Sequence, residues 1–342
     1  MKKKLVKCGG VTFGDGNVYV QSMLSRRADD IRGNIRQALR LVKAGCEVIR
    51  AAVPEKKDAA LIAALKENVS VPVVADIHYD YKIALEAISA GADKIRLNPG
   101  NMGGADRLKK IANACKAANI PIRVGVNSGS VPVSGGVRDL AGYAVENVRL
   151  LERFDFDDIV VSVKSSDVPE TIKAYRALSR FRYPLHIGVT EAGTERAGLL
   201  KSAAGIGSLL CDGIGDTVRV SLTAEPEREV AAALDILKIA GIKHAAAFGV
   251  EVVSCPACGR TKIDVVSLAK RVEGLTRGLK KNIKIAVMGC SVNGPGECKD
   301  ADLGITGGDG EGLIFKKGAI VRKVAESELL AALTEEIRQW QN

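Results

Sequence analysis

The sequence predicts an α/β protein in which an N-terminal (β/α)8 TIM barrel is followed by a small C-terminal α/β domain that carries cysteines. Short runs rich in β-branched residues alternate with longer amphipathic segments from near residue 18 to near residue 241. The β-then-α unit recurs roughly every 25–30 residues, and eight such units are typical of this barrel. A doubly wound open sheet is the alternative, but no Gly-x-Gly-x-x-Gly turn follows the first strand. The barrel is therefore favoured.

The spacing of apolar residues, which differs between strands and helices, also predicts the individual elements. We expect strands at Val18–Met23, Glu47–Arg50, Val71–His78, Lys94–Pro99, Pro121–Asn127, Asp158–Lys164, Tyr183–Thr190 and Thr217–Leu222. The helices expected between them include Asp29–Ala44, Ala105–Ala118, Arg138–Phe154, Pro169–Arg180 and Glu225–Ala240. A last amphipathic helix is expected at Glu326–Trp340, at the end of the second domain.

The length and the cysteine content set the domain organisation and the compartment. A chain of 342 residues, 46% of them hydrophobic, has room for two domains, and we expect the barrel at residues 1–241 and the second domain at 242–342.

No apolar run approaches the ~20 residues that cross a membrane. The basic start at Met1 is not followed by the apolar segment of a signal peptide. Eight cysteines without a secretion signal indicate a reducing compartment and metal or catalytic use, so we expect a cytoplasmic protein with no membrane partner.

The net charge of +10 raises the question of a nucleic-acid partner. The Lys and Arg residues are dispersed rather than gathered in blocks, and aromatic residues make up only 4% of the chain. Both observations argue against a surface on which bases stack. We therefore expect no nucleic-acid partner.

Charged and polar side chains gather where the expected strands end, and in a TIM barrel the loops after the strands form the active face. These residues are Gln21, Ser22, Arg50, Asp76, His78, Arg96, Asn98, Arg123, Asn127, Lys164, Glu191, Arg219 and Ser221. Five of them are cations from five different strands, and such a set is costly to bury without an anion. Guanidinium groups pair well with phosphate oxygens, so the pattern predicts a polyanion pocket that suits a diphosphate better than a monophosphate.

Two carboxylates and one histidine are candidates for chemistry beside these cations. We expect Glu191, just past the seventh strand, to transfer protons. We expect Asp76 to position His78 or an arginine. His186 lies inside the seventh strand, where a hydrogen-bonded packing role and a catalytic role both stay open.

The C-terminal part contains two cysteine motifs, Cys255-Pro-Ala-Cys258-Gly-Arg and Met288-Gly-Cys290-Ser-Val-Asn-Gly-Pro-Gly-Glu297. Soft thiolates select zinc or iron–sulfur clusters. Three thiolates with a weaker oxygen ligand form a site that can release the oxygen and open one metal ion to substrate. Cys298 leaves a second possibility open, in which four cysteines close the site and Glu297 is only a neighbour.

Further motifs extend along the whole chain, in the order Val20-Gln-Ser-Met23, Ala75-Asp-Ile-His78, Lys94-Ile-Arg-Leu-Asn-Pro-Gly100, Arg123-Val-Gly-Val-Asn127, Val189-Thr-Glu-Ala-Gly193 and Gly213-Ile-Gly-Asp-Thr-Val-Arg-Val-Ser-Leu222. Together with the cysteine motifs, they resemble the IspG/GcpE family of bacterial 4-hydroxy-3-methylbut-2-en-1-yl diphosphate synthases in its short two-domain form. The resemblance implies a TIM barrel and a sulfite-reductase-like domain with a 4Fe–4S cluster. It implies reductive ring opening and dehydration of 2-C-methyl-D-erythritol 2,4-cyclodiphosphate in the methylerythritol phosphate route to isoprenoids, with electrons from reduced flavodoxin or ferredoxin.

The resemblance also assigns roles to residues. It implies that Cys255, Cys258 and Cys290 bind the cluster, with Glu297 as the displaceable fourth ligand. It implies that Glu191 is the acid or base. The residues that it places around the diphosphate are Arg50, His78, Arg96, Arg123, Asn127, Lys164, Arg219 and Ser221. It further implies a homodimer in which the cluster domain of one chain caps the barrel of the other.

Two other classes of function stay open on the sequence. One is a zinc-ribbon protein that binds nucleic acid through its C-terminal domain, with the barrel as a scaffold or a phosphosugar enzyme. The other is a pterin-type barrel enzyme with a structural metal. The zinc-ribbon interpretation leaves the strand-end arginines and Glu297 unexplained. A requirement for electrons in turnover would distinguish the reductive synthase from the pterin-type enzyme.

Overall fold

A computed structural model describes residues 3–133, 138–242, 249–279, 281–290 and 298–340 of the chain. The proposed fourth ligand, Glu297, lies outside these residues. The chain forms two compact units, Met1–Ala247 and Phe248–Asn342. This division lies close to the boundary that we expected after residue 241.

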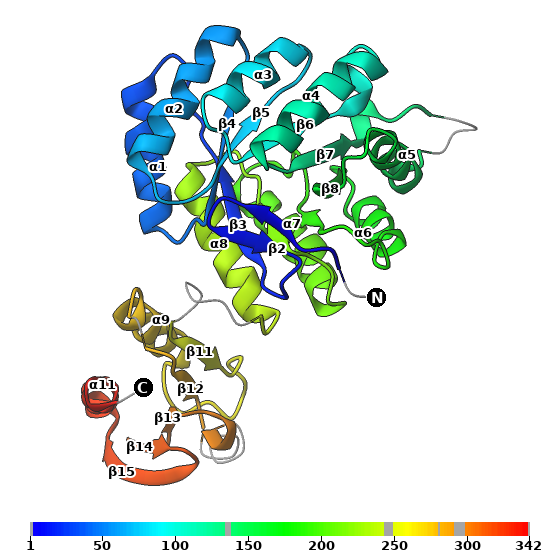
Figure 1. Ribbon diagram of the computed structural model, residues 1–342. Helices are drawn as coiled ribbons and strands as arrows, with labels where there is room; N and C mark the ends of the chain where they lie inside the picture. Colours follow the sequence, from blue (N-terminus) through cyan, green and yellow to red (C-terminus); the bar gives the residue numbers. More distant parts are fainter. Residues whose placement is uncertain (1–2, 134–137, 243–248, 280, 291–297, 341–342) are drawn as a thin grey trace. The chain divides into compact units, whose positions relative to one another are not determined.

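The first unit is built on an eight-stranded parallel sheet that curves into a barrel (Figure 1). Its strands are β3 (Tyr19–Met23), β4 (Val48–Ala52), β5 (Val73–Asp76), β6 (Lys94–Leu97), β7 (Ile122–Asn127), β8 (Ile159–Lys164), β9 (His186–Ile187) and β10 (Thr217–Val218). They pair in the order β8-β7-β6-β5-β4-β3-β10-β9. A parallel bridge between Val161 of β8 and Leu185, just before β9, joins the two ends of the sheet. The predicted TIM barrel is confirmed.

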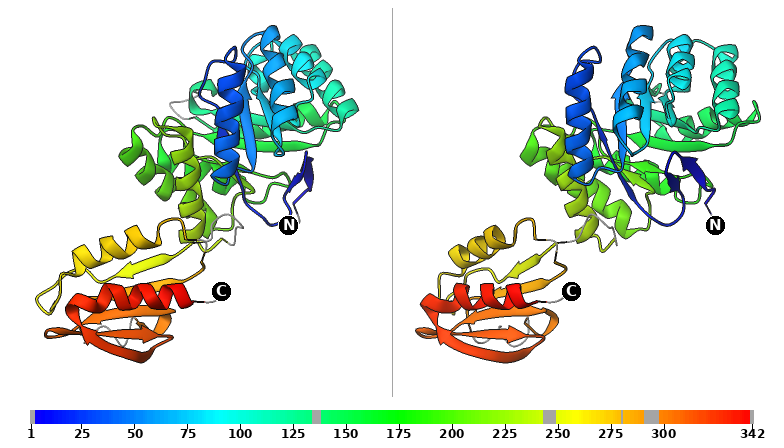
Figure 2. Two further views of the ribbon diagram at one scale, coloured as in Figure 1. Left: turned by 90° about the vertical axis from the view of Figure 1, so that its left-hand side faces the viewer. Right: turned by 60° about the vertical axis from the view of Figure 1, so that its left-hand side comes forward.

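Helices follow these strands and cover the outside of the barrel (Figures 1 and 2). They are α1 (Ile31–Lys43), α2 (Ala59–Asn68), α3 (Tyr81–Ser89), α4 (Ala105–Ala118), α5 (Leu140–Glu152), α6 (Val168–Ala177), α7 (Glu195–Cys211) and α8 (Pro226–Ile239), with short 3₁₀ turns at η1 (Lys56–Asp58), η2 (Pro99–Asn101) and η3 (Ser128–Ser130). Aspartates begin several of them, because the side chains of Asp30, Asp139 and Asp167 accept hydrogen bonds from backbone N–H groups of the first turn. Apolar strand residues such as Ile95 and Val124 pack against the helices in the main core.

The seventh and eighth strands are shorter than predicted, because the backbone N–H groups beyond them form hydrogen bonds outside the regular strand pairing. The N–H of Thr190 donates to the carbonyl of Ser165, and the N–H of Leu222 donates to the Glu229 carboxylate at 2.9 Å. Regular pairing therefore ends at Ile187 and Val218 rather than at Thr190 and Leu222. The residues after each short strand form loops.

A hairpin at the start of the chain, which we did not predict, packs against the amino-terminal part of the barrel strands. It consists of β1 (Val6–Cys8) and β2 (Val11–Phe13). Its buried side chains form one apolar cluster with interior residues of β4, β5 and β8, namely Val48, Val74 and Val160. Two positions further along the same strands, the side chains are Arg50, Asp76 and Ser162. Because side chains alternate across a strand, the interior changes from apolar to polar toward the carboxyl ends.

In its described residues, the second unit is a five-stranded mixed sheet with two helices (Figure 2). Its elements are β11 (Glu251–Ser254), α9 (Val265–Thr276), β12 (Lys284–Met288), η4 (Cys298–Asp300), β13 (Leu303–Gly307), β14 (Glu311–Lys316), β15 (Ala319–Ala325), η5 (Glu326–Glu328) and α11 (Leu329–Gln339). β11, β12 and β13 are parallel, and β14 and β15 are added antiparallel. Both helices share one core with Ile285 and Val287 of β12. The last helix begins at Leu329 rather than Glu326, because a 3₁₀ turn precedes it.

Within the described ranges, no helix combines the length and the apolar character that crossing a membrane requires.

Candidate active site

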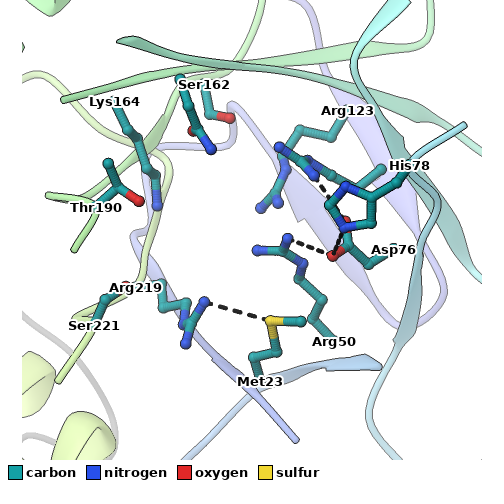
Figure 3. A pocket seen from close by; sticks show the side chains of 12 residues that line it. Met23, Arg50, Asp76, His78, Arg123, Ser162, Lys164, Thr190, Arg219 and Ser221 are labelled. Carbon is teal, nitrogen blue, oxygen red and sulfur yellow. Dashed lines mark hydrogen bonds and ion pairs between the residues drawn. The ribbon is translucent and has the colours of Figure 1, made fainter. Parts of the chain in front are cut away.

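Twelve side chains line a cavity of about 260 Å³ at the carboxyl ends of the barrel strands (Figure 3). The lining residues are Met23, Arg50, Asp76, His78, Arg96, Arg123, Asn127, Ser162, Lys164, Thr190, Arg219 and Ser221. All eight residues predicted to surround a diphosphate are among them, as is Asp76. The volume lies near the lower end of the range of about 300–1,000 Å³ that is usual for ligand sites, so the cavity suits a compact molecule.

Asp76, at the end of β5, connects three of these side chains. Its carboxylate lies 2.7 Å from Arg50 Nη2, 3.1 Å from Arg96 Nη1 and 3.1 Å from His78 Nε2. Burial alone would raise the pKa of Asp76, but Arg50, His78 and Arg96 together hold the pKa well below its usual value. The carboxylate is therefore ionised at neutral pH. Its three contacts suit the positioning role that we expected for it.

Arg123 is almost completely enclosed, and its Nε and Nη1 atoms have no hydrogen-bond partner among the described residues. The strand register places it directly beside Arg96, whose Nε is also without a partner in the described part of the chain. Burial lowers the pKa of Arg123 well below its usual value, and Arg50 and Arg96 lower it further. Buried guanidinium donors without partners are costly, so they indicate that an anion occupies the cavity when the site is in use.

Arg219 reaches the cavity from the loop after β10. Its guanidinium lies 3.4 Å from the carboxylate of Glu229 in α8 and 3.5 Å from the sulfur of Met23. Burial lowers the pKa of Arg219, whereas Glu229 raises it. Because Glu229 also accepts the N–H of Leu222, it fixes both the arginine and the loop that carries it.

Lys164 ends β8, and its Nζ lies 3.1 Å from Nε2 of His186. Burial lowers the pKa of Lys164 well below its usual value, and Arg123 and Arg219 add to this effect. The backbone of Gly188 passes so close that a Cβ there would lie 2.7 Å from the lysine Nζ and 2.4 Å from the carbonyl oxygen of Arg219. Only glycine leaves room for the lysine side chain at this position.

Five cationic side chains thus face one small cavity, and Figure 3 shows the labelled ones around a common centre. Among the described residues, Asp76 and Glu229 are the carboxylates that contact them. Positive charge therefore exceeds negative charge in a largely desolvated space. An anion with several oxygens matches this arrangement chemically.

Glu191 directly follows the lining residue Thr190 but is not itself part of the lining. It is exposed, and its backbone has a φ of +50°, in the left-handed region that non-glycine residues seldom adopt. Such backbone conformations are enriched at functional sites. The expected role of Glu191 in proton transfer stays a prediction.

The cysteine motifs lie at one edge of the second sheet. Cys255 follows β11 and Cys290 follows β12, and these strands are parallel neighbours. The N–H of Gly289 donates to Cys255 Sγ at 3.2 Å. The N–H of Arg260 lowers the pKa of the exposed Cys258 thiol, and Cys290 is close enough to oppose this shift. In the described ranges, which exclude Glu297, no group of three or more histidine, cysteine or acidic side chains forms a metal site.

Three lining residues were missed on the sequence: Met23, Ser162 and Thr190. The signal for two of them was available. Ser162 is two positions before Lys164 on the same strand, and Thr190 is two positions after Gly188, so both share a face with residues that the site uses. Conversely, Gln21, Ser22 and Asn98 are buried but do not line the cavity.

Comparisons with known proteins cover nearly the whole chain. The GcpE TIM-barrel domain matches residues 3–234, and the GcpE protein C-terminal domain matches residues 251–339. A protein of Caldanaerobacter subterraneus subsp. tengcongensis is 50% identical over 98% of this chain and 96% of its own length. A protein of Caldicellulosiruptor saccharolyticus is 51% identical over 98% of each chain. Both relatives are named 4-hydroxy-3-methylbut-2-en-1-yl diphosphate synthase (flavodoxin).

Solved structures of dihydropteroate synthases are similar to the barrel. The enzyme of Stenotrophomonas maltophilia gives a TM-score of 0.54 at 17% identity, over 69% of this chain and 97% of its own. The Yersinia pestis enzyme gives the same TM-score at 14% identity, over 69% of this chain and 97% of its own. At this level of identity the likeness shows the fold alone.

Proposed function

We propose that this chain, which belongs to the GcpE family, catalyses the reductive ring opening and dehydration of 2-C-methyl-D-erythritol 2,4-cyclodiphosphate to 4-hydroxy-3-methylbut-2-enyl diphosphate. The family follows from the match of both domains and from about half of the residues being identical to those of curated synthases over nearly the full length. The resemblance stated from the sequence is therefore confirmed. These matches favour the synthase over the zinc-ribbon and pterin-type alternatives.

The observation that carries the proposal is the set of buried cations around one cavity. The hydrogen-bond donors come from four different strands and from the loop after β10, and they belong to Arg50, Arg96, Arg123, Lys164 and Arg219. Some of the guanidinium donors, such as Nε and Nη1 of Arg123, have no partner within the described chain. A cyclic diphosphate concentrates its charge in a compact group, which suits a cavity of about 260 Å³. We infer that His78, Asn127 and Ser221 complete its hydrogen bonds.

The reaction requires two electrons and two protons for each substrate, and it releases one water. The cation pocket holds the diphosphate as a C–O bond breaks, and it stabilises the negative charge that forms on the leaving phosphate oxygen. We assign to Glu191 the proton transfer that accompanies loss of water, because it directly follows the lining residue Thr190. Asp76 acts through Arg50, Arg96 and His78, which it holds in place.

We propose a 4Fe–4S cluster as the electron relay, bound by Cys255, Cys258, Cys290 and Glu297. The donor set supports this cofactor: soft thiolates prefer such clusters, and backbone N–H groups near their sulfurs tune them. The N–H of Gly289 is placed in this way toward Cys255 Sγ, and that of Arg260 toward Cys258. The cluster would supply electrons one at a time to the bound substrate. A site closed by Cys298 is the competing ligand set.

The partners follow from the same chemistry. The relatives' name specifies flavodoxin, and we propose reduced flavodoxin or ferredoxin as the electron donor for this chain. A reductant of this kind and unoxidised thiols suit the cytoplasm.

We further propose a homodimer in which the cluster domain of one chain serves the barrel of the other. Mixing a Glu191→Gln chain with a Cys290→Ser chain would then restore part of the activity, and no complementation would contradict the shared site.

Metal and sulfide analysis of protein purified without oxygen tests the cofactor directly. We expect about four irons and four sulfides per chain, with broad thiolate-to-iron absorption. Stoichiometric zinc without sulfide would remove the electron path and contradict the reductive chemistry. A Glu297→Ala variant that kept full activity would favour Cys298 as the fourth ligand.

A further inference from the structure

We propose that His186 is a positioning residue that holds the ammonium group of Lys164 toward the diphosphate cavity. Lys164 is part of the cavity lining, whereas His186 is completely buried and is not. The two side chains meet at 3.1 Å between Nζ and Nε2. This inference rests on the diphosphate pocket proposed above and deepens it.

The chemistry of the two groups decides which one carries the proton. A lysine amine is more basic than an imidazole by about four pKa units in water. Burial lowers the pKa of both groups, and the lysine, as the more basic of the two, is the one that carries the charge toward an anion in the cavity. A charged lysine has donors and no acceptor. Nε2 of His186 must then be the acceptor, which makes the imidazole neutral with its proton on Nδ1.

The surroundings of His186 fit this tautomer. Nδ1 lies 3.3 Å from the hydroxyl oxygen of Thr217, which can accept its proton. Thr217 is the registered neighbour of His186 in the adjacent parallel strand. The hydroxyl of Tyr175 donates to the His186 carbonyl oxygen at 2.5 Å and accepts from the N–H of Val163 at 3.2 Å, so the backbone is fixed as well.

The consequence for the cavity is geometric. Lys164 has a flexible side chain and sits among cations that repel it, as Arg123 and Arg219 both do. A neutral acceptor behind Nζ takes one N–H direction and leaves the other two for the ligand. Gly188 supplies the space on the remaining side, where a Cβ would lie 2.7 Å from Nζ. His186 thus fixes the position of the Lys164 ammonium group in the cavity without contacting the ligand itself.

The test measures inorganic pyrophosphate affinity by calorimetry on the full chain, purified without oxygen. His186→Leu removes the acceptor, and we expect it to weaken pyrophosphate binding about 10- to 100-fold, because a hydrogen bond to a charged group is lost. His186→Gln keeps an acceptor near the position of Nε2 and should stay within about threefold of the parent. A second pair of variants tests the hydroxyl of Thr217. Thr217→Val removes it and should weaken pyrophosphate binding, whereas Thr217→Ser keeps it and should not.

A double-mutant cycle with Lys164→Met separates positioning from a merely structural role. If His186 acts through the lysine, His186→Leu changes affinity by less than about twofold in the Lys164→Met background. An equal loss in both backgrounds, equal losses for leucine and glutamine, or no loss for leucine would each overturn the proposal. Absence of pyrophosphate binding by the parent chain would overturn it too. Failure of the proposed synthase activity is a separate result, since the cycle is read without turnover.

Discussion

Arg96 and Arg123 are registered neighbours on adjacent parallel strands, and only Arg96 contacts a carboxylate within the described chain. Arg96 lies 3.1 Å from Asp76, whereas Nε and Nη1 of Arg123 are buried without partners there. Arg96 is thus paired with a carboxylate that it shares with Arg50, whereas Arg123 has no carboxylate partner within the described chain. An unsatisfied buried charge lowers stability unless a ligand completes it. The unpaired guanidinium of Arg123 therefore indicates that the folded state is less stable than it could be, and that this cost serves anion binding.

Replacing Arg123 by methionine should separate these two effects. We expect the free energy of unfolding to stay the same or to rise, by up to a few kcal/mol (about 1–4), because an apolar side chain of similar size replaces an unpaired charge. We expect pyrophosphate affinity to fall at least about tenfold. Denaturant titration and calorimetry measure the two quantities. Arg32→Met, at an exposed arginine of α1, is the control and should change neither; a strongly destabilised Arg123→Met would contradict the reading.

Asp76→Asn should be costly for stability, because it leaves Arg50 and Arg96 without their carboxylate. We expect a loss of about 3–5 kcal/mol at neutral pH, measured by denaturant unfolding. The folded pKa of Asp76 lies well below the usual value, so its stabilisation is complete above about pH 4 and is lost as the pH falls through the folded pKa. The difference between the two chains should therefore shrink below about pH 4. The exposed Asp29→Asn serves as control and should cost less than about 1 kcal/mol, because its ion pair with Arg27 is exposed to solvent. A constant difference between the Asp76 chains across this range would argue against an ionised Asp76.

Gly188→Ala tests the space around Lys164. The added Cβ would meet the Arg219 carbonyl oxygen at 2.4 Å and the lysine Nζ at 2.7 Å, so the backbone and the lysine must move. We expect a loss of stability of about 1–3 kcal/mol and a clear loss of pyrophosphate affinity. Gly207→Ala in α7, where a Cβ meets nothing within 4 Å, is the matched control and should stabilise the protein by about 0.5–1 kcal/mol. Unchanged anion binding in Gly188→Ala would show that the lysine position is not critical.

Glu191→Gln tests the proposed proton transfer. The substitution keeps size and hydrogen bonding but removes the acid, so we expect kcat to fall about 10²–10⁴-fold. Pyrophosphate affinity should stay within about threefold, since Glu191 does not line the cavity. Glu195→Gln, at an exposed glutamate in the first turn of α7, should leave both quantities unchanged. A Glu191→Gln chain with ordinary kcat would remove the residue from the mechanism.

Lys94 gives a pH-dependent prediction from the other end of the barrel. Its Nζ is fully buried without a hydrogen-bond partner in the described residues and lies 4.2 Å from the centre of the Phe13 ring. Burial lowers its pKa to about 8. Below pH 8 the folded chain carries the full cost of the buried charge, so Lys94→Met should be more stable by about 3 kcal/mol.

That advantage should shrink as the pH rises from 8 toward 10.5, because the folded lysine is then neutral while the unfolded one still binds its proton. Thermal or denaturant unfolding of both chains across this range measures the difference. Burial raises the pKa of nearby Cys8 to about 11, but this thiol is present in both chains and affects them alike to first order. An advantage that does not change with pH would show that Lys94 is not titrating.

The barrel and most of its cavity could be predicted from the sequence because both depend on local periodicity. Side chains two apart on a strand share a face, so the positions of Arg96 and Arg123 within apolar strands already predict that both face one interior. The pairing of Lys164 with His186 could not be predicted in this way. It depends on the register of separate strands and on the close passage of Gly188.

The N-terminal hairpin was missed for a related reason. Its strands have three residues each, too few to show an alternating pattern, and they are stabilised by packing on Val48, Val74 and Val160 far along the chain. The cysteine motifs were recognised from their spacing. Their assembly with Glu297 stays a prediction, because this residue lies outside the described ranges.

The most direct test is turnover of the cyclodiphosphate by protein purified without oxygen, with reduced flavodoxin as electron source and phosphorus NMR as readout. We predict that the cyclodiphosphate signals disappear and those of the linear 4-hydroxy-3-methylbut-2-enyl diphosphate appear, only when the reductant is present. A protein that contains four irons and four sulfides per chain and binds the cyclodiphosphate, but leaves it unchanged with the reductant, would contradict the proposed function.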